Sequence, residues 1–528
     1  MSGLTVRRAT HDLMRALGMT TIFGNPGSTE LRFFKDAPPD FRYVLALQES
    51  SAVAMADGYA QATGRAAFVN LHSAVGVGHA LGNIFTAMRN RTPLVITAGQ
   101  QNRALLPTEP FLFAEQATEL PRPYVKWSSE PARAQDVPAA IARAYYTAMQ
   151  RPYGPAFVSI PEDDWDGDTE PLAPREVVGE FVGDAAGLRA VAAALDASTR
   201  PALVVGPGVD RDGAWHVTVT LAERTGASVW VSPLSSRCGF PEDHPAFAGF
   251  LVPDRRKLRD QLGGHDVIVV LGAPVFTYHV PSDGPFLPDG ATLFQLVDDP
   301  GAASYAPVGT AVLTSLGPGV AEIVKALVGP ARAVATGRGP RPTPPASDPM
   351  TGALVMHTID AVRPPTSIIV EEAPSHRNAM HDHLLVRRPG GFYAGASGGL
   401  GYALPAAVGV ALGSPDERVV CLLGDGSSLY SIQALWTAAQ EALPVSVVIF
   451  DNRGYGALKA FARTMGVDRP PGVDLPGIDF LGLAAGFGCP GRRVERADEL
   501  EAALRWSFES AGPTLVAVAV DDAMERLY

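Results

Sequence analysis

Short apolar runs alternate with amphipathic stretches along the whole chain, as is typical of an α/β protein. Residues 419–423 and 445–450 form the clearest pair of runs, and a helical pattern at residues 432–442 lies between them. Short runs that are apolar on both faces predict buried parallel strands, and a helix between two of them completes a βαβ unit. Because open parallel sheets bind ligands at the carboxyl ends of their strands, the residues after these two runs are the first candidates for a functional site.

The first third of the chain repeats this alternation. Ser28, Glu49 and His72 each follow a predicted strand, and a hydroxyl, a carboxyl and an imidazole at neighbouring strand ends are the layout of a catalytic rim. The predicted strands are residues 21–23, 43–47, 67–71 and 94–98, the predicted helices are residues 4–17 and 50–63, and a glycine turn at residues 76–78 is expected before a further helix.

Two stretches of linker composition divide the rest of the chain. Residues 161–174 are charged and contain proline, and residues 329–349 are rich in Pro, Gly, Ala and Arg. The fold class predicted is α/β, with three doubly wound parallel-sheet domains at residues 1–174, 175–340 and 341–528. Their further strands are expected at residues 202–205, 228–231, 265–271, 292–297, 367–370 and 514–520.

Composition narrows the choice of partners and compartment. The chain has 528 residues, 46% of them hydrophobic and 19% charged, which suits about three globular domains. A net charge of −12 argues against nucleic acid and anionic membranes as partners. The three cysteines have no metal-binding spacing, and no apolar run reaches the ~20 residues of a membrane span. These features predict a soluble protein of the cytoplasm.

The residues after the two buried strands favour a divalent cation that carries a phosphorylated ligand. Asp425 stands between two glycines after the first strand, and Asn452 follows the second. Carboxylate and amide oxygens are ligands that Mg²⁺ accepts beside phosphate oxygens, and the glycines let phosphates approach the backbone. The glycines alone would fit an ordinary strand–turn–helix connection, but Asn452 at the next strand end makes a metal site the stronger interpretation. The Gly206-Pro207-Gly208 turn lacks the third glycine of a dinucleotide fingerprint, so a nucleotide in the middle domain is the weaker hypothesis.

Several motifs resemble those of the thiamine diphosphate-dependent 2-oxoacid decarboxylases over essentially the whole chain. Gly424-Asp425-Gly426 with Asn452 is typical of thiamine diphosphate enzymes in general. More selective are residues 23–28, 45–49, 70–74, 272–279, 398–401 and 455–458, which resemble the benzoylformate decarboxylases within that family. The resemblance implies a pyrimidine-binding, a middle and a diphosphate-binding domain, in that order.

The resemblance also implies how the cofactor is held. Asp425, Asn452 and the carbonyl oxygen of Gly454 would bind Mg²⁺, for which Ca²⁺ can substitute. Glu49 would activate thiamine diphosphate by sharing a proton with its aminopyrimidine ring, which suits a carboxyl group in a poorly solvated place. The further cofactor contacts implied are Gly398, Leu400, Gly426, Ser427, Tyr455 and Ser375.

For the substrate, the resemblance implies that Ser28 contacts the carboxylate and that His72 and His279 transfer protons. Three positions depart from the pattern of the family: Phe111 replaces an aliphatic residue, Ala394 an aromatic one, and Pro374 a residue with a hydroxyl group. These departures leave the preferred acyl group open but do not touch the reaction class. The implied pocket comprises Ser28, Leu112, Ala457, Leu458 and Phe461.

The activity that this resemblance implies is the non-oxidative decarboxylation of an aromatic 2-oxoacid, most closely of benzoylformate to benzaldehyde and CO₂. It would run through a thiamine diphosphate ylid, an enamine and protonation of that enamine, with carboligation as a side activity. Two alternatives stay open: an acetolactate synthase-like carboligase, and a catalytically silent subunit with the thiamine diphosphate fold. The family pairs pyrimidine and diphosphate domains from different subunits, so a homo-oligomer is expected, at least a dimer and in full a tetramer built as a dimer of dimers, with active sites at the subunit interface. A place in aromatic catabolism, such as the mandelate pathway, would follow from the substrate.

Overall fold

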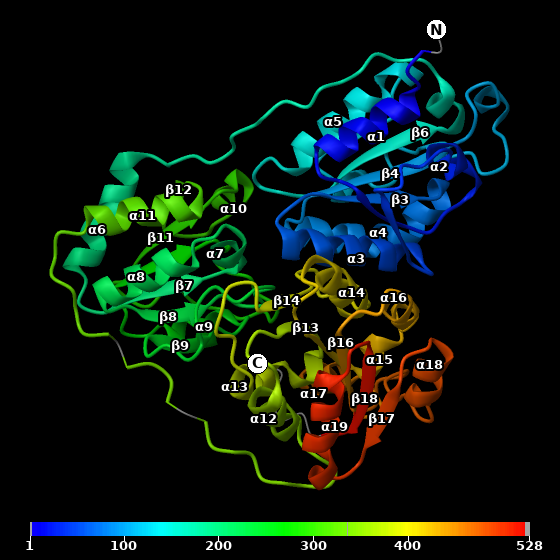
Figure 1. Ribbon diagram of the computed structural model, residues 1–528. Helices are drawn as coiled ribbons and strands as arrows, with labels where there is room; N and C mark the ends of the chain where they lie inside the picture. The colour runs from blue at the N-terminus through cyan, green and yellow to red at the C-terminus, as the bar shows by residue number, and fades with distance from the viewer. Residues whose placement is uncertain (1–2, 335, 340, 523–528) are drawn as a thin grey trace.

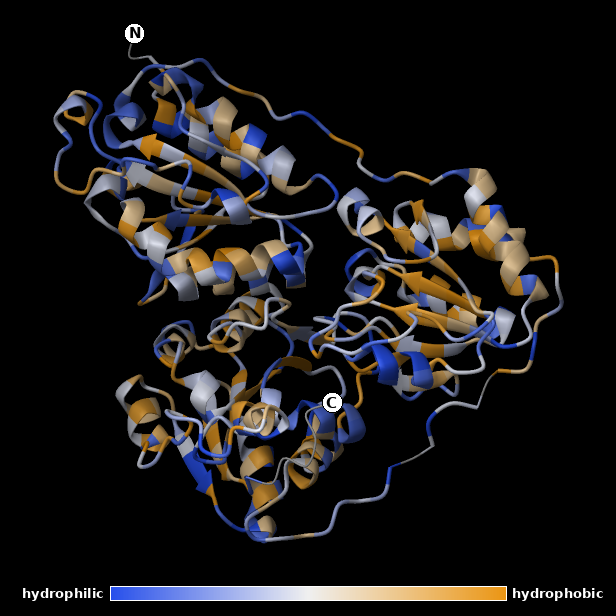
Figure 2. Ribbon diagram, turned by 180° about the vertical axis from the view of Figure 1, so that it is seen from behind, coloured by the Kyte–Doolittle hydropathy of each residue, from blue (hydrophilic) through white to orange (hydrophobic). Residues whose placement is uncertain are grey.

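The computed structural model describes residues 3–334, 336–339 and 341–522, and these form three six-stranded sheets with helices packed against them (Figure 1). Every strand pair in the described residues is parallel, which confirms the predicted fold class. The strands lie inside each domain and are mostly apolar on both faces (Figure 2) because helices cover both sides. The predicted domain boundaries stay predictions, and residues 1, 340 and 528, which mark three of the predicted domain ends, lie outside the described residues.

The N-terminal sheet has the strand order β2-β1-β3-β4-β6-β5. Its register sets Gly24 of β1 level with Leu45 of β2 and Asn70 of β3, so these three strands end at one edge, ahead of the three predicted catalytic side chains. The elements are α1 (Val6–Ala16), β1 (Thr21–Gly24), α2 (Leu31–Phe34), β2 (Arg42–Leu45), α3 (Glu49–Thr63), β3 (Ala67–Leu71), α4 (Ser73–Asn90), β4 (Leu94–Gln100), β5 (Ser128–Ser129), α5 (Val137–Ala148) and β6 (Ala156–Pro161), with 3₁₀ turns at Ser28–Glu30, Leu106–Thr108, Arg122–Tyr124, Ala134–Asp136 and Glu162–Asp166.

Two predictions for this domain are wrong. Gly76 lies inside α4 and not in a turn, and it is suited to that place because a Cβ atom there would crowd Glu49 Oε1 at 3.3 Å. The predicted linker at residues 161–174 begins with a 3₁₀ turn that belongs to the domain: Trp165 is buried, and Asp164 Oδ1 lies 2.6 Å from Arg103 Nε. The acidic residues made this turn look like a linker, but part of its charge is neutralised within the fold.

The middle sheet has the order β12-β11-β10-β7-β8-β9, and all four predicted strands form. The two strands that were not predicted, β9 and β12, are the short ones at the edges. The elements are α6 (Ala185–Ala197), β7 (Pro201–Val205), α7 (Pro207–Arg211), α8 (Trp215–Thr225), β8 (Ser228–Val231), β9 (Phe247–Phe250), α9 (Arg255–Gln261), β10 (Val267–Leu271), β11 (Thr292–Val297), α10 (Pro300–Ser304), β12 (Thr310–Leu313) and α11 (Leu316–Ala326).

The C-terminal sheet has the order β14-β13-β15-β16-β18-β17. Gly424, the last residue of β15, is level with Phe450 of β16, so the segments that carry Asp425 and Asn452 leave the sheet side by side. The elements are α12 (Gly352–Val362), β13 (Ile368–Glu372), a 3₁₀ turn (Pro374–His376), α13 (Arg377–His383), β14 (Phe392–Ala394), α14 (Ala403–Gly413), β15 (Val419–Gly424), α15 (Asp425–Ser428), α16 (Ala434–Gln440), β16 (Val445–Asp451), α17 (Gly456–Thr464), α18 (Phe480–Gly486), β17 (Gly491–Val494), α19 (Ala497–Glu509) and β18 (Thr514–Ala519).

Helices α3 and α14 join the N- and C-terminal domains, as Figure 1 shows where the two domains meet. Their backbones touch at glycines: a Cβ atom on Gly58 would lie 2.1 Å from the Ala406 carbonyl oxygen, and one on Gly409 would lie 1.8 Å from that of Met55. One continuous apolar core runs through both domains at this contact. The two domains of one chain are therefore held rigidly to each other.

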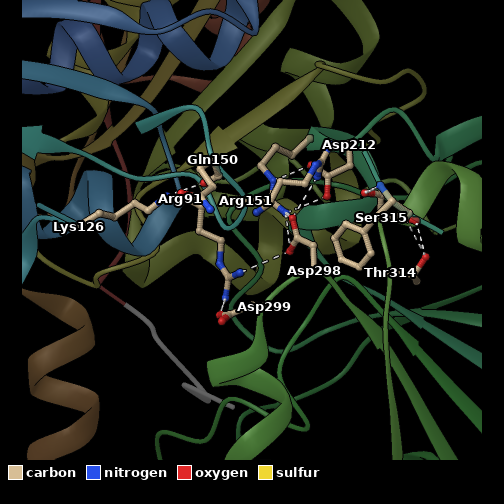
Figure 3. Close-up of polar contacts among 11 residues, drawn as sticks. Arg91, Lys126, Gln150, Arg151, Asp212, Asp298, Asp299, Thr314 and Ser315 are labelled. Carbon is tan, nitrogen blue, oxygen red and sulfur yellow. Dashed lines mark hydrogen bonds and ion pairs between the residues drawn. The ribbon is translucent and has the colours of Figure 1, made fainter. Parts of the chain in front are cut away.

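An ion-pair cluster joins the N-terminal domain to the middle domain (Figure 3). Arg151 Nη1 lies 2.8 Å from Asp212 Oδ1 and 3.0 Å from Asp298 Oδ2, and Arg91 binds Asp298 and Asp299. The Asp212 and Asp298 side chains are buried, so each depends on its arginine partners for charge compensation. This cluster holds the middle domain in place against the N-terminal domain. The middle domain forms one wall of the cavity described below.

Candidate active site

A cavity of about 1230 Å³ opens at the carboxyl edge of the C-terminal sheet. Residues from all three domains line it, so the domain contacts above determine its shape. The six cofactor contacts predicted in the C-terminal domain line this cavity: Gly398, Leu400, Gly426, Ser427, Tyr455 and Ser375. The prediction of these contacts came from resemblance alone, and the fold gathers all six in one place.

The predicted metal ligands converge beside this cavity. Asp425 is held by two backbone donors, Gly426 N at 2.6 Å and Gly454 N at 2.8 Å, and burial raises the pKa of its carboxyl group to about 6. The end of the Asn452 side chain lies 2.6 Å from the Gly454 carbonyl oxygen and 3.3 Å from Asp425 Oδ2. Without a cation, the amide nitrogen must face these two acceptors.

To hold a cation, the amide of Asn452 would turn over and present its oxygen, which would complete a set of three oxygens from a carboxylate, an amide and a backbone carbonyl. Such a set fits Mg²⁺ or Ca²⁺, whose remaining ligands would come from phosphate and water. In the described part of the chain, no group of three or more His, Cys, Asp or Glu side chains could hold a metal. The candidate cation site therefore depends on the amide of Asn452 and the carbonyl of Gly454 as well as on the carboxylate of Asp425.

Glu372, to which the sequence analysis assigned no role, supports the cofactor loop. This buried residue ends β13, and its carboxyl group accepts backbone hydrogen bonds from Gly401 (2.7 Å), Tyr402 (2.7 Å) and Ala403 (2.9 Å) at the start of α14. Burial raises the pKa of Glu372 to about 7. The residue thus anchors the loop that carries Leu400, and its only signal in the sequence was an acidic pair at a strand end.

The part of the cavity suited to a substrate lies between the middle and C-terminal domains. His279 comes from the loop after β10, where its backbone N–H donates to the Pro253 carbonyl oxygen at 2.9 Å. Its ring meets the ring of Phe461 edge to face at 4.9 Å between centroids. Ala457 and Leu458 at the start of α17 complete an apolar wall of the same cavity. One imidazole beside apolar and aromatic side chains suits an aromatic ligand with a single reacting polar group.

The other predicted residues lie elsewhere. Ser28, Glu49, His72 and Leu112 are not among the residues that line this cavity. They lie at the carboxyl edge of the N-terminal sheet or beside it, since Ser73 Oγ, next to His72, donates to the Leu112 carbonyl oxygen at 2.8 Å. We call these four residues the N-terminal half-site. Asp425, Asn452, Gly454 and the cofactor and substrate residues around the cavity are called the C-terminal half-site.

Two of the N-terminal half-site residues have partners that the sequence analysis did not single out. Glu49 Oε2 lies 3.0 Å from Nδ1 of His79, a histidine to which no role was assigned. His72 Nδ1 lies 2.9 Å from Oε2 of the buried Glu30. Neither contact has a sequence signal, because His79 looks like a surface residue of α4 and Glu30 like one acidic residue in a turn.

The positions that depart from the pattern of the family do not share one surface. Pro374 lines the cavity. Ala394 is buried in the core between the C-terminal and middle domains, whereas Phe111 is 88% exposed. Neither Ala394 nor Phe111 lines the cavity in the single chain.

Comparisons with known proteins agree with this geometry. Three family models described as domains of thiamine pyrophosphate enzymes match the chain: the N-terminal TPP binding domain at residues 4–118, the central domain at residues 188–323 and the C-terminal TPP binding domain at residues 373–518. The chain belongs to the thiamine pyrophosphate-dependent enzymes. Within the described residues, no helix combines the length and the apolar character needed to cross a bilayer.

Within this family, the chain is similar to benzoylformate decarboxylases. It is 43% identical to the benzoylformate decarboxylase of Pseudomonas aeruginosa over 97% of this chain and 98% of that protein. Its structure matches that of benzoylformate decarboxylase from Polynucleobacter necessarius with a TM-score of 0.96 and 41% identity, over 99% of both chains. It matches a 4-hydroxybenzoylformate decarboxylase from Rhodococcus jostii with a TM-score of 0.95 and 42% identity, over 98% of this chain and 99% of that one. A putative acetolactate synthase large subunit from Mycobacterium tuberculosis is 30% identical over 95% of this chain and 96% of that protein.

Proposed function

We propose that this protein decarboxylates an aromatic 2-oxoacid, most closely benzoylformate, to the aldehyde and CO₂, with thiamine diphosphate held by Mg²⁺. The observation that carries this proposal is the cavity of the C-terminal half-site, where a predicted cation site and a histidine within an apolar wall stand around one space. Similarity over the full chain to decarboxylases of benzoylformate and 4-hydroxybenzoylformate supports the aromatic substrate.

Bound thiamine diphosphate supplies the carbanion that adds to the keto carbon and accepts the electrons released with CO₂. The residues of the chain bind, orient and move protons around it. Asp425, Asn452 and the Gly454 carbonyl hold the cation that neutralises the diphosphate. Glu49 holds the proton that activates the aminopyrimidine ring. His279 stands against Phe461 at the reacting end of the cavity, where its imidazole can deliver or accept a proton.

Ser28 and His72 complete the site from the N-terminal half-site of a second chain. Their position supports this assignment, since they lie outside the cavity of their own chain. Exposed apolar side chains near this edge, Leu31, Leu47 and Val75, suit burial in a subunit contact. We therefore propose a homodimer as the smallest active form, and a tetramer as the full assembly. The three cysteines are all free and buried, which suits a reducing compartment, so we place the protein in the cytoplasm and its reaction in the breakdown of aromatic acids.

A substrate panel tests the proposal. The full-length protein is incubated with thiamine diphosphate, Mg²⁺ and each of benzoylformate, 4-hydroxybenzoylformate, a branched 2-oxoacid and pyruvate, and aldehyde and CO₂ are measured. Benzaldehyde with stoichiometric CO₂, and a kcat/KM at least about 10-fold higher for the aromatic acids, is the expected result. A product with a new C–C bond and no free aldehyde would instead identify an acetolactate synthase-like carboligase. Cofactor binding without turnover of any of these acids would identify a silent subunit.

A further inference from the structure

Beneath His72 lies a buried polar cluster centred on the carboxylate of Glu30, which is 2% exposed. Its Oε1 accepts hydrogen bonds from Thr29 Oγ1 at 2.6 Å and from the Gly99 backbone N–H at 3.0 Å. Its Oε2 accepts one from the Gly27 backbone N–H at 3.0 Å and lies 2.9 Å from His72 Nδ1. Each carboxylate oxygen thus has two partners, which is what a buried charge requires.

Two glycines make room for this contact. A Cβ atom on Gly27 would lie 1.9 Å from His72 Nδ1, and one on Gly99 would lie 2.3 Å from Glu30 Oε1. The backbone of Gly27 has φ −132° and ψ −178°, an extended conformation that any residue adopts. Glycine at position 27 is therefore needed for the space that the imidazole occupies and not for its own backbone conformation. The local chain is built around the contact between Glu30 and His72.

The contact also determines which ring nitrogen carries a proton. A carboxylate only accepts, and Thr29 Oγ1, 3.1 Å from His72 Nδ1, already donates its hydrogen to Glu30. Nδ1 must therefore carry the hydrogen that points inward. In the described residues, all the hydrogen bonds of this ring fall on Nδ1, and the side chain is 23% exposed. The neutral imidazole then presents the lone pair of Nε2 outward, to the rim shared with Ser28 and Glu49.

We propose that Glu30 is the positioning residue of His72: it holds the Nδ1–H tautomer, fixes the ring and stabilises the imidazolium whenever Nε2 takes up a proton. This inference rests on the proposed function, in which His72 transfers a proton during decarboxylation. The physical logic is that of the buried carboxylate behind the histidine of a serine protease, which orients the ring without being protonated itself. Glu30 touches neither substrate nor cofactor in this assignment.

The first experiment compares Glu30→Gln with Glu30→Asp and with Glu242→Gln in the full-length protein loaded with thiamine diphosphate and Mg²⁺. Glu242 is a matched control, because it is a buried glutamate that accepts a backbone hydrogen bond from Val386 at 3.0 Å in another part of the molecule. We expect Glu30→Gln to lower kcat about 100-fold or more with KM for benzoylformate within about threefold, Glu30→Asp to restore part of the loss, and Glu242→Gln to leave activity unchanged.

The pH profile separates a positioning role from a merely structural one. Without the carboxylate, the pH profile of kcat/KM should change from that of the wild type, because an imidazolium formed at His72 has lost its counter-charge. A uniformly lower kcat with an unmoved profile would overturn the proposal, and so would an active Glu30→Gln with a wild-type profile.

A second measurement needs no catalytic activity and no variant of Glu30. ¹⁵N NMR of histidine-labelled wild-type protein, with His72 identified by the loss of its signals in His72→Asn, should show that the neutral ring carries its proton on Nδ1 and none on Nε2. A proton on Nε2 would overturn the proposal. Absence of turnover with every 2-oxoacid would refute the proposed function while leaving the tautomer assignment intact, so the two failures are distinguishable.

Discussion

The N- and C-terminal half-sites are built in the same way but lie in different surroundings. Each occupies the carboxyl edge of a six-stranded parallel sheet at the point where neighbouring strands end level with each other. The C-terminal half-site opens on a cavity that the other two domains of the chain close. The N-terminal half-site is absent from that cavity, and exposed apolar side chains such as Leu47 (42%) and Val75 (54%) lie close to it in the sequence.

From this difference we propose different roles for the two half-sites. The C-terminal half-site holds the groups proposed to bind, namely the cation ligands, the glycines that would accommodate the phosphates and the apolar wall, together with one proposed proton-transfer residue, His279. The N-terminal half-site holds the groups proposed to move protons or contact the substrate carboxylate: Glu49, His72 and Ser28. The complete site that we propose requires the two edges to meet. Within one chain, the contact between the two domains is formed by α3 and α14. The comparison therefore predicts that substitutions in the two half-sites have different effects. It also predicts that two variant chains, each altered in one half-site, restore activity when they are combined.

The largest effect is expected at the cation site. Asp425→Ala removes the one charged ligand of the C-terminal half-site, so the affinity for thiamine diphosphate in the presence of Mg²⁺ should fall by about 100-fold or more. Quenching of tryptophan fluorescence on cofactor titration measures this affinity. Asp498→Ala, at an exposed position in α19, serves as the control and should bind as the wild type does. An unchanged affinity of Asp425→Ala for thiamine diphosphate would show that this half-site does not bind the cofactor through Asp425.

A substitution in the N-terminal half-site should slow the proton transfer and leave the binding of the cofactor nearly unchanged. Glu49→Gln keeps the shape of the side chain but loses the exchangeable proton, so exchange of the C2 proton of bound thiamine diphosphate should slow by about 10²- to 10⁴-fold. Cofactor affinity should stay near that of the wild type. Quenched-flow exchange in D₂O, followed by NMR of the released cofactor, measures the rate. The matched variant His79→Asn removes the half-exposed partner of Glu49 and should change the exchange rate only a few-fold. A wild-type exchange rate in Glu49→Gln would refute the proton-transfer role of Glu49.

The pH dependence of binding should follow the C-terminal half-site. Asp425 binds a cation only when ionised, and burial raises its pKa to about 6. As the pH falls through about 6, the carboxyl group takes up a proton that the metal must displace, so the apparent affinity for Mg²⁺ should drop about tenfold per pH unit below that point and level off above it. Metal titrations at fixed cofactor between pH 5 and pH 8 measure the curve. A flat curve across this range would mean that Asp425 is not the ligand that governs binding.

The smallest effect is expected when two inactive variants are combined and part of the activity returns. If each active site takes one half-site from each of two chains, a mixture of Asp425→Ala and Glu49→Gln chains forms mixed dimers with one intact site and one doubly altered site. With random pairing, co-expression should restore about a quarter of the wild-type activity, because about half of the dimers are mixed and each has one of two sites. Each variant expressed alone is the control. A mixture no more active than its components would indicate that both half-sites come from one chain.

Much of this organisation could be predicted from sequence. The long apolar runs identified the inner strands of the middle and C-terminal sheets and most of those of the N-terminal sheet. The placing of Asp425 and Asn452 after neighbouring runs predicted a cation site from strand geometry. The short edge strands β5, β9, β12, β14 and β17 were missed, because runs of two to four residues carry little periodic signal. One inner strand of the N-terminal sheet, β6, was also missed. The 3₁₀ turn around Trp165 was mistaken for a linker, because its composition does not reveal that Arg103 binds Asp164.

The sequence by itself determined the alternation of strands and helices, the residue types at the strand ends and the family that these motifs resemble, because each depends on neighbours close along the chain. Only the tertiary structure decided that Glu30 lies behind His72, that Glu372 anchors the loop of Leu400, and that the predicted site residues fall into two separate groups. These contacts join residues from different elements through a few buried hydrogen bonds, and such bonds depend on how the sheets pack in space. Local pattern carries no information about that packing.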